Sequence, residues 1–192
     1  MSFRGQAAML ARWSERLSRL ELTVAGVCAS AVTLLIVLNV VTRALNLALF
    51  WVDEVAIYVM VWMVFLGTAV TLKRRQALMV TVLVDYLPAG LRRAVGVFID
   101  LSVLLFALLL IAFAWNWYSP LELARHGFDV AEFSAETMNF MYQERASTFS
   151  LPKFWVWLIV PYFGLSVAFH TLANLWRDPG GRYMNEQTES EP

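Results

Sequence analysis

The side chains of this 192-residue chain that could do chemistry are concentrated near one short segment. Arg43 is followed by Asp53 and Glu54, and apolar runs lie on both sides of the three residues. Charged groups so close to hydrocarbon are costly unless they pair with one another or reach water. We therefore expect an Arg43–Glu54 ion pair, with Asp53 beside it, to hold a hairpin between two helices rather than to catalyse a reaction.

The composition gives no support for an enzyme or a metalloprotein. A single cysteine, Cys28, excludes a disulfide within the chain and a cysteine-rich metal cluster. Haem held by two histidines would need both of them within the membrane. Of the two histidines, His126 and His170, only His170 falls within a predicted span. Lys+Arg 15 balance Asp+Glu 15, so no overall basic field attracts nucleic acid. We predict no catalytic residue, no metal site and no cofactor of the chain's own.

The elements that position these groups are membrane helices. Hydrophobic residues make up 59% of the chain, against roughly 45–50% in an ordinary globular domain. Four apolar stretches are long enough to cross a hydrocarbon core of about 30 Å: residues 22–42, 55–72, 101–118 and 154–176. The sequence therefore predicts an all-α membrane protein in which residues 1–178 form a single domain and residues 179–192 a polar tail.

The distribution of basic residues predicts the orientation. Lys and Arg concentrate in the N-terminal flank, in the connection between the second and third spans, and in the tail. Cytoplasmic loops carry such an excess. Both termini are therefore expected on the cytoplasmic side of a bacterial inner membrane, which the chain crosses several times.

The segments that flank the spans carry further predictions. Residues 1–21 have leucines and a tryptophan at helical spacing among arginines, which predicts an amphipathic helix in the membrane interface; a plain extension of the first span is the alternative. Residues 77–87 are too short to cross and are expected to lie in the cytoplasmic interface or to pack on a neighbouring element. Asp100 is expected to cap the third span, and Pro161 to kink the fourth.

The second outward connection, residues 119–153, is long for a helix bundle. Within it, residues 129–143 are predicted to form a short helix with acidic residues early and an apolar face. A lid, a docking surface for a partner and simple packing on the membrane surface all remain open. The candidate docking residues are Asp129, Glu132, Phe133, Glu136 and Phe140.

A row of aromatic residues follows the acidic pair along the second span. Tyr58, Trp62 and Phe65 recur every three or four residues, so they share a helix face below Trp51. Gly67 is small enough to let another helix approach closely. The row suits contact with another protein subunit, although an ordinary aromatic belt at the headgroups has the same composition.

Taken together, these motifs resemble a known family. The chain reads Asn39-Val-Val-Thr-Arg43, then Phe50-Trp51-Val-Asp-Glu54, then Phe65-Leu-Gly67, then the basic turn Lys73-Arg-Arg75. This order is similar to that of the DctQ-like small membrane subunits of tripartite ATP-independent periplasmic (TRAP) transporters. Gln76 and Leu78 depart from it, because the family often has a glycine and a histidine there.

The resemblance implies a supporting role in transport. In the family, a large DctM-like membrane subunit holds the substrate and sodium sites, and a soluble DctP-like periplasmic protein delivers an organic acid. The small subunit is then a scaffold and part of the docking surface, with bound phospholipid as a possible companion. The alternative is an autonomous small four-helix exporter or channel, for which a membrane-embedded carboxylate would be needed. The sequence does not identify the substrate.

Overall fold

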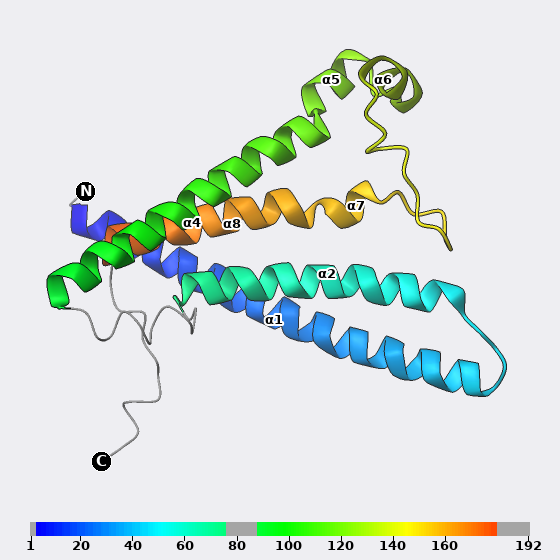
Figure 1. Ribbon diagram of the computed structural model, residues 1–192, viewed down its shortest axis with the longest axis horizontal. Helices are drawn as coiled ribbons and strands as arrows, with labels where there is room; N and C mark the ends of the chain where they lie inside the picture. Colours follow the sequence, from blue (N-terminus) through cyan, green and yellow to red (C-terminus); the bar gives the residue numbers. More distant parts are fainter. Residues whose placement is uncertain (1–2, 76–87, 180–192) are drawn as a thin grey trace. The chain divides into compact units, whose positions relative to one another are not determined.

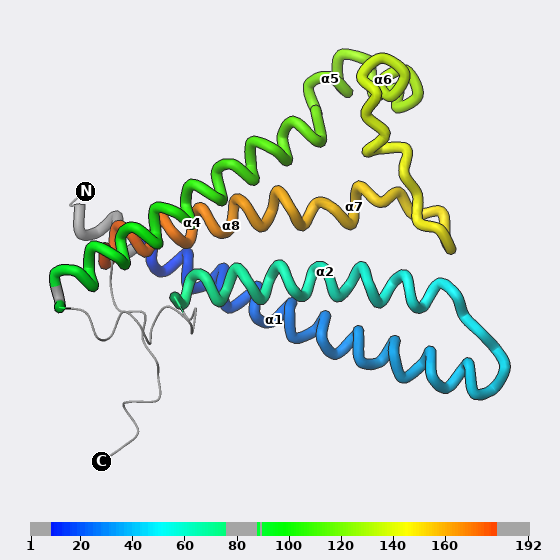
Figure 2. Tube along the Cα trace, viewed as in Figure 1, coloured from blue at the N-terminus to red at the C-terminus, as the bar shows by residue number. Residues whose placement is uncertain are grey.

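The computed structural model describes residues 3–75 and 88–179, and Figures 1 and 2 trace its helices. These are α1 (Phe3–Ala44), α2 (Phe50–Lys73), α4 (Ala89–Tyr118), α5 (Pro120–Arg125), α6 (Val130–Thr137), α7 (Phe154–Trp157) and α8 (Ile159–Arg177). Four helical stretches in the described ranges are long and apolar enough to cross a membrane: Met9–Ala44, Phe50–Lys73, Gly90–Arg125 and Phe154–Arg177. The predicted all-α fold with four spans is confirmed. The segment 77–87, and the tail from residue 180, lie outside the described residues.

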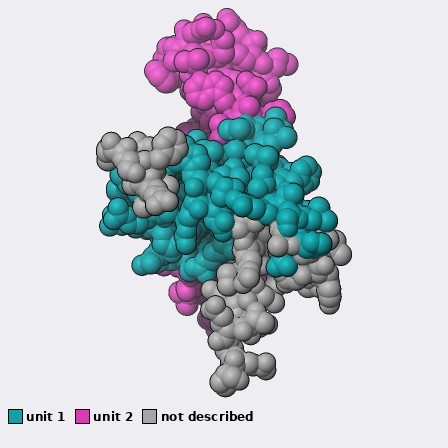
Figure 3. Space-filling view, turned by 90° about the vertical axis from the view of Figure 1, so that its left-hand side faces the viewer, with its two compact units in different colours: residues 1–23, 66–109, 163–192 teal, residues 24–65, 110–162 magenta. Residues whose placement is uncertain are grey.

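The chain divides into two compact units, coloured separately in Figure 3. Unit 1 comprises Met1–Thr23, Leu66–Leu109 and Phe163–Pro192, and unit 2 comprises Val24–Phe65 and Leu110–Tyr162. The turn between α1 and α2 and the long connection before α7 therefore belong to unit 2. The basic turn after α2 belongs to unit 1.

The first helix is longer than its predicted span. Residues 3–44 form one helix of 42 residues, where about 20 suffice to cross a membrane. No proline occurs in this stretch to end the helix. The N-terminal segment is thus continuous with the first span, and its place in the membrane interface stays a prediction. The helix ends where Asn46 adopts φ 58 and the Leu47 N–H donates to the Thr42 carbonyl at 2.8 Å.

The third helix begins twelve residues before the predicted span. Helix α4 starts at Ala89, directly after Pro88, so Asp100 is its twelfth residue. The prediction that Asp100 caps a helix is therefore wrong. The predicted span starts later because Arg92, Arg93 and Asp100 interrupt the apolar run. In the structure, Asp100 pairs with Arg75 in the turn after α2.

The fourth span is divided at Leu158 into α7 and α8. Pro161 has no N–H to donate to the Trp157 carbonyl four residues earlier, and its ring crowds that carbonyl. The helix is interrupted at this point and resumes toward Arg177. This interruption lies within one helical turn before Pro161.

The long connection in unit 2 contains two short helices. Asp129 caps α6, because its carboxylate accepts from the N–H groups of Ala131 at 2.8 Å and Glu132 at 3.1 Å. Helix α6 ends at Thr137, since Met138 adopts φ 55. The helix predicted over residues 129–143 is therefore shorter, and Phe140 lies beyond its end. The helix α5 had no counterpart in the sequence predictions.

Candidate functional site

The hairpin cluster comprises seven residues of unit 2: Asn39, Arg43, Asp53, Glu54, Tyr58, Ser147 and Thr148. Its ion pair joins Arg43 to Asp53, with 2.7 Å between the guanidinium Nη2 and the carboxylate. Asn39 completes the contact, because its amide NH₂ donates to Asp53 and its oxygen accepts from Arg43 Nε at 3.0 Å. The predicted Arg43–Glu54 ion pair is therefore wrong, because Arg43 pairs with Asp53. This ion pair joins the end of α1 to the start of α2.

Glu54 instead holds a segment that lies far away in the sequence. Its carboxylate accepts from the N–H groups of Ser147 and Thr148, each at 2.8 Å, and from the Thr148 hydroxyl at 2.6 Å. The Tyr58 hydroxyl, one helix turn along α2, donates to the same carboxylate at 2.6 Å. Hydrogen bonds to an ionised acceptor are the strong ones in proteins. Glu54 thus fixes the tip of the long connection onto α2.

The segment that Glu54 holds is itself a tight turn. The Ala146 N–H donates to the Leu151 carbonyl at 2.9 Å, and the Lys153 N–H donates to the Glu144 carbonyl at 2.9 Å. The two ends of residues 144–153 therefore run antiparallel, with Ser147 and Thr148 at the tip. The ring of Phe149 packs edge-on against Tyr58, with the centroids 6.3 Å apart.

Of the residues predicted to contact another subunit, two use their polar groups within the chain. The Trp62 indole N–H donates to the Val156 carbonyl at 2.8 Å, which fixes α7 against α2 in unit 2, and Tyr58 bonds Glu54. Tyr58, Trp62 and Phe65 are half-buried, whereas Trp51 is exposed. A side chain at Gly67 would meet no atom of the chain within 4 Å. Trp51 and Gly67 are therefore the most open members of the predicted contact.

The predicted docking residues separate into exposed and buried ones. Glu132, Glu136 and Phe140 are exposed, and Asp129 is used as the helix cap. Phe133, however, has 0% exposure and packs edge-on between the rings of His126 and Tyr142. Phe133 cannot meet a partner directly, because it forms the small core under α6.

That small core is closed by a tyrosine. The Tyr142 hydroxyl donates to the Tyr118 carbonyl at 2.7 Å, and burial raises the pKa of Tyr142 above its ordinary value. The phenol therefore remains a neutral donor throughout the physiological pH range. It anchors the connection to the end of α4 within unit 2.

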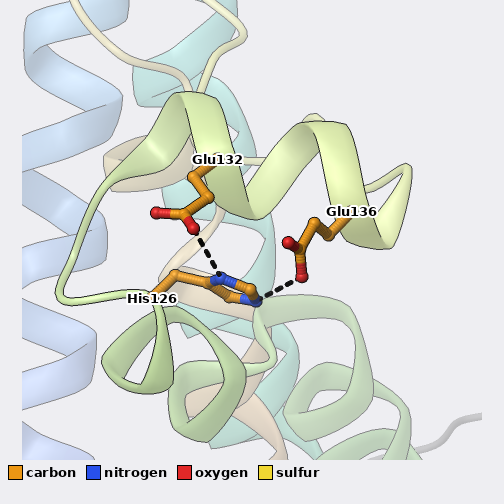
Figure 4. Close-up of side chains that lie close together, drawn as sticks. All are labelled: His126, Glu132 and Glu136. Atoms are coloured by element: carbon orange, nitrogen blue, oxygen red, sulfur yellow. Dashed lines mark ion pairs between the residues drawn. The ribbon is translucent and has the colours of Figure 1, made fainter.

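His126 lies between two carboxylates of α6 (Figure 4). Its Nδ1 is 4.0 Å from a Glu132 oxygen and its Nε2 is 3.6 Å from a Glu136 oxygen. A metal ion would bind one ring nitrogen, whereas these carboxylates approach different nitrogens. The three side chains therefore connect the end of α5 to α6.

The basic-turn cluster stabilises unit 1, and it comprises Glu15, Lys73, Arg75, Asp100 and Asp178. Arg75 adopts φ 53, a left-handed conformation that is unfavourable for a residue with a Cβ. Its Nε donates to the Asp100 carboxylate at 3.2 Å, Nη2 bonds the second oxygen, and Nη2 also donates to the Asp178 carbonyl at 3.1 Å. Lys73 pairs with Glu15 of α1. The turn after α2 is thereby tied to α1, α4 and the end of α8.

Sequence reasoning missed a third group, the buried histidine cluster of Ser14, Glu21, Ser166 and His170 in unit 1. His170 Nε2 lies 3.0 Å from a Glu21 oxygen, and its Nδ1 lies 2.8 Å from the Ser14 hydroxyl. Ser166 donates to the other Glu21 oxygen. Both His170 and Glu21 are 1% exposed. The imidazole of His170 thus lies between Glu21 and Ser14, and its contacts join α1 to α8.

Replacing Glu54 with glutamine is expected to loosen the tip of the 144–153 turn. A glutamine retains one acceptor oxygen, and its NH₂ group would face N–H and O–H donors. We expect the amides of Ser147 and Thr148 to exchange with deuterium about tenfold faster. Glu122→Gln is the matched control, because the Glu122 carboxylate pairs locally with Arg125 of the same helix, α5. Equal exchange in the two variants would contradict the anchoring role of Glu54.

Four helical stretches that are long and apolar enough to cross a membrane define a class of protein, namely a small multi-pass membrane protein. A family described as "Tripartite ATP-independent periplasmic transporters, DctQ component" matches residues 32–179. The matched region contains the whole hairpin cluster and most of the basic-turn cluster. The chain belongs to the DctQ family of TRAP transporter components.

A curated relative supports the same assignment. The C4-dicarboxylate TRAP transporter small permease protein DctQ of Vibrio cholerae serotype O1 (strain ATCC 39315 / El Tor Inaba N16961) is 28% identical over 156 residues. The match covers 77% of this chain and 66% of the relative, so the chain spans just under two thirds of the relative's length. No solved structure matches the chain.

Proposed function

We propose that this chain is the small permease subunit of a TRAP transporter in the bacterial inner membrane, with both termini cytoplasmic. In this role it scaffolds a large DctM-like subunit that carries the substrate and sodium sites. A DctP-like binding protein delivers an organic acid to the assembly. A C4-dicarboxylate is the first candidate substrate, because the curated relative is named for C4-dicarboxylate transport.

The observation that carries this proposal is how the polar groups are used. Glu54 holds a loop, Arg75 and Asp100 join helices, and Glu21 pairs with His170. An exporter that is coupled to protons needs a membrane carboxylate that can change its protonation during transport. Here Glu21, Glu54 and Asp100 are engaged in contacts that join one element to another. This use of carboxylates favours a scaffold over the autonomous exporter.

The exposed apolar surface supports a large membrane partner. Ile57, Met60 and Val64 form an exposed row on α2 in unit 2, and Trp51 is 42% exposed at its start. Lipid alone could cover such a surface. The open position at Gly67, at a helix face suited to close approach, favours contact with a second protein.

For docking of the binding protein, the exposed carboxylates of α6 are the best candidates. Glu132 and Glu136 are exposed on a helix whose other face is fixed by Phe133. The 144–153 turn beside Glu54 adds a second ordered surface. A rigid, acidic surface suits a partner with a complementary basic patch, because charge complementarity speeds encounter and selects partners.

The experiment that tests the proposal is recovery of a complex. The chain is tagged, co-expressed with a DctM-like large subunit and a DctP-like binding protein, and purified in a mild detergent. We expect the large subunit to be recovered in stoichiometric amount. Recovery of the tagged chain without it would contradict the scaffold role.

A substitution at Gly67 then tests where the large subunit binds. Gly67→Leu should leave the chain itself folded, because nothing lies within 4 Å and leucine favours a helix more than glycine does. If a partner helix packs there, recovery of the large subunit falls by about fivefold or more. Gly26→Leu on α1 is the matched control, since Gly26 is equally open. Equal recovery with both variants would place the contact elsewhere.

A further inference from the structure

A histidine and two glutamates come together where α5 meets α6 in unit 2 (Figure 4). His126 directly follows α5, and Glu132 and Glu136 are four residues apart on α6, so both carboxylates lie on the helix face toward the ring. One ligand atom from each of the three side chains lies within 4.8 Å of the other two. Imidazole and carboxylate groups are common ligands of divalent metal ions.

The backbone holds the imidazole ring in place. The His126 N–H donates to the Glu122 carbonyl at 3.1 Å, and the Asp129 N–H donates to the His126 carbonyl at 3.0 Å. Gly127 adopts φ 60, which turns the chain so that α6 follows directly. The ring packs edge-on against Phe133 with 6.3 Å between the centroids, and the His126 side chain is 14% exposed. One ligand is thus in position before any metal ion binds.

The two carboxylates bring a surplus of negative charge to the ring. The side chains of Glu132 and Glu136 are 58% and 63% exposed. Among the described residues, no lysine or arginine forms an ion pair with either of them, and nearby Arg125 pairs instead with Glu122 at 2.6 Å. Even a protonated imidazole would balance only one of the two carboxylates. A divalent cation can balance both, and it can bind the ring nitrogen as well.

The distances between the ligand atoms suit a metal ion better than direct hydrogen bonds. His126 Nε2 lies 3.6 Å from a Glu136 oxygen, which is too long for a hydrogen bond. Two ligand atoms that bind one tetrahedral zinc ion at about 2.1 Å lie roughly 3.4 Å apart. Glu132 lies nearer to Nδ1, at 4.0 Å, so its exposed side chain must rotate toward Nε2 as the ion binds. Because the three ligand atoms already lie within 4.8 Å of one another, a change of side-chain rotamer is enough.

We infer that His126, Glu132 and Glu136 bind a divalent transition-metal ion, with Zn²⁺ as the first candidate. The imidazole favours such an ion over Ca²⁺ and Mg²⁺, which prefer oxygen ligands. Three protein ligands leave a position for water on a four-coordinate ion. The bound ion fixes α6 to the end of α5. The inference concerns this chain alone and does not depend on assembly with other transport subunits.

The test is a zinc titration of the full chain, purified in a neutral detergent with a tag that contains no histidine. The binding protein is left out, because Glu132 and Glu136 are also its proposed docking residues. Bound metal is counted by equilibrium dialysis and elemental analysis. We expect one Zn²⁺ per chain, bound about tenfold or more tightly than Ca²⁺. A lack of saturation up to about 1 mM zinc, or equal affinity for Ca²⁺, overturns the inference.

Variants of matched size locate the bound ion. Glu136→Gln replaces an exposed carboxylate with an amide and should weaken zinc binding about tenfold or more, and His126→Gln should do the same. Glu144→Gln is the matched control, because Glu144 is an exposed carboxylate of the same connection, 3.9 Å from Lys153. It should leave zinc binding within about twofold. Equal affinities in Glu136→Gln and Glu144→Gln overturn the inference, because the zinc would then bind elsewhere.

Hydrogen exchange tests the structural consequence of metal binding. Zinc that joins α6 to the end of α5 should slow deuterium exchange at the amides of residues 134–137 about fivefold or more. In Glu136→Gln the same zinc concentration should leave these amides unchanged, while circular dichroism shows the variant to be as helical as the original chain. Saturating zinc that does not slow these amides in the original chain overturns the assignment to this site.

Discussion

Replacing His170 with leucine is expected to lower the thermal midpoint of the detergent-solubilised chain more than any other single substitution considered for this protein. The change leaves the Glu21 carboxylate, which is 1% exposed, without the imidazole N–H that lies 3.0 Å from it. Removing one partner of a buried ionisable pair costs about 3–5 kcal/mol. In a chain of this length that corresponds to a fall of roughly 10 °C.

The matched substitution is His126→Leu, which removes the other histidine of the chain. His126 lies beside exposed carboxylates at 3.6 Å or more, so its loss should lower the midpoint by only a few degrees, about 1 kcal/mol. The double variant Glu21→Leu with His170→Leu should recover part of the loss, because two apolar side chains replace the pair. A midpoint in His170→Leu no lower than in His126→Leu would contradict the role of the buried histidine cluster.

Asp100→Asn is the second substitution with a large expected effect. Arg75 and Asp100 have side-chain exposures of 9% and 5%, and they join the turn after α2 to the middle of α4. Asparagine keeps the size of the side chain but removes the charge that balances the guanidinium. We expect a loss of about 3 kcal/mol, together with weaker constraint on the left-handed backbone of Arg75.

The measurement is again the thermal midpoint, read by the loss of helical circular dichroism in detergent. Asp129→Asn is the control, because asparagine also caps helices well and the effect there should stay below about 1 kcal/mol. Arg75→Met with Asp100→Leu should be less destabilised than Asp100→Asn. An Asp100→Asn protein as stable as the Asp129→Asn protein would show that the ion pair does not hold unit 1 together.

The four spans could be predicted from the sequence because each is an apolar run that a bilayer requires, and the break near Pro161 follows from the missing N–H. The start of α4 could not be predicted in the same way. Asp100 interrupts the apolar run, and its partner, Arg75, lies far earlier in the sequence, in the turn after α2. A charge in a membrane helix can be interpreted only when the residue that neutralises it is known.

The hairpin cluster shows the same limit. The sequence correctly brought Arg43, Asp53 and Glu54 together, because a short turn returns them to one level. The predicted partner of Arg43 was the wrong carboxylate, because Glu54 accepts a hydrogen bond from Thr148, which lies 94 residues away in the sequence. No local pattern shows a contact across that separation.

For the buried histidine cluster, a signal was present but was not used. Ser14, Ser18, Glu21 and Ala25 recur at steps of four, three and four residues, a face of small and polar side chains. The predicted amphipathic helix rests instead on large side chains such as Trp13 and Leu20, and the structure exposes both. In a membrane helix the small polar face is the one that packs against other helices, while large apolar residues face lipid.

The central claim, that this chain supports transport without carrying it out, is tested most directly in liposomes. Purified chain is reconstituted alone, or with the large subunit and the binding protein, and uptake of a labelled C4-dicarboxylate is followed under an inward sodium gradient. The account predicts accumulation only when all three components are present. Accumulation by the chain alone would contradict it.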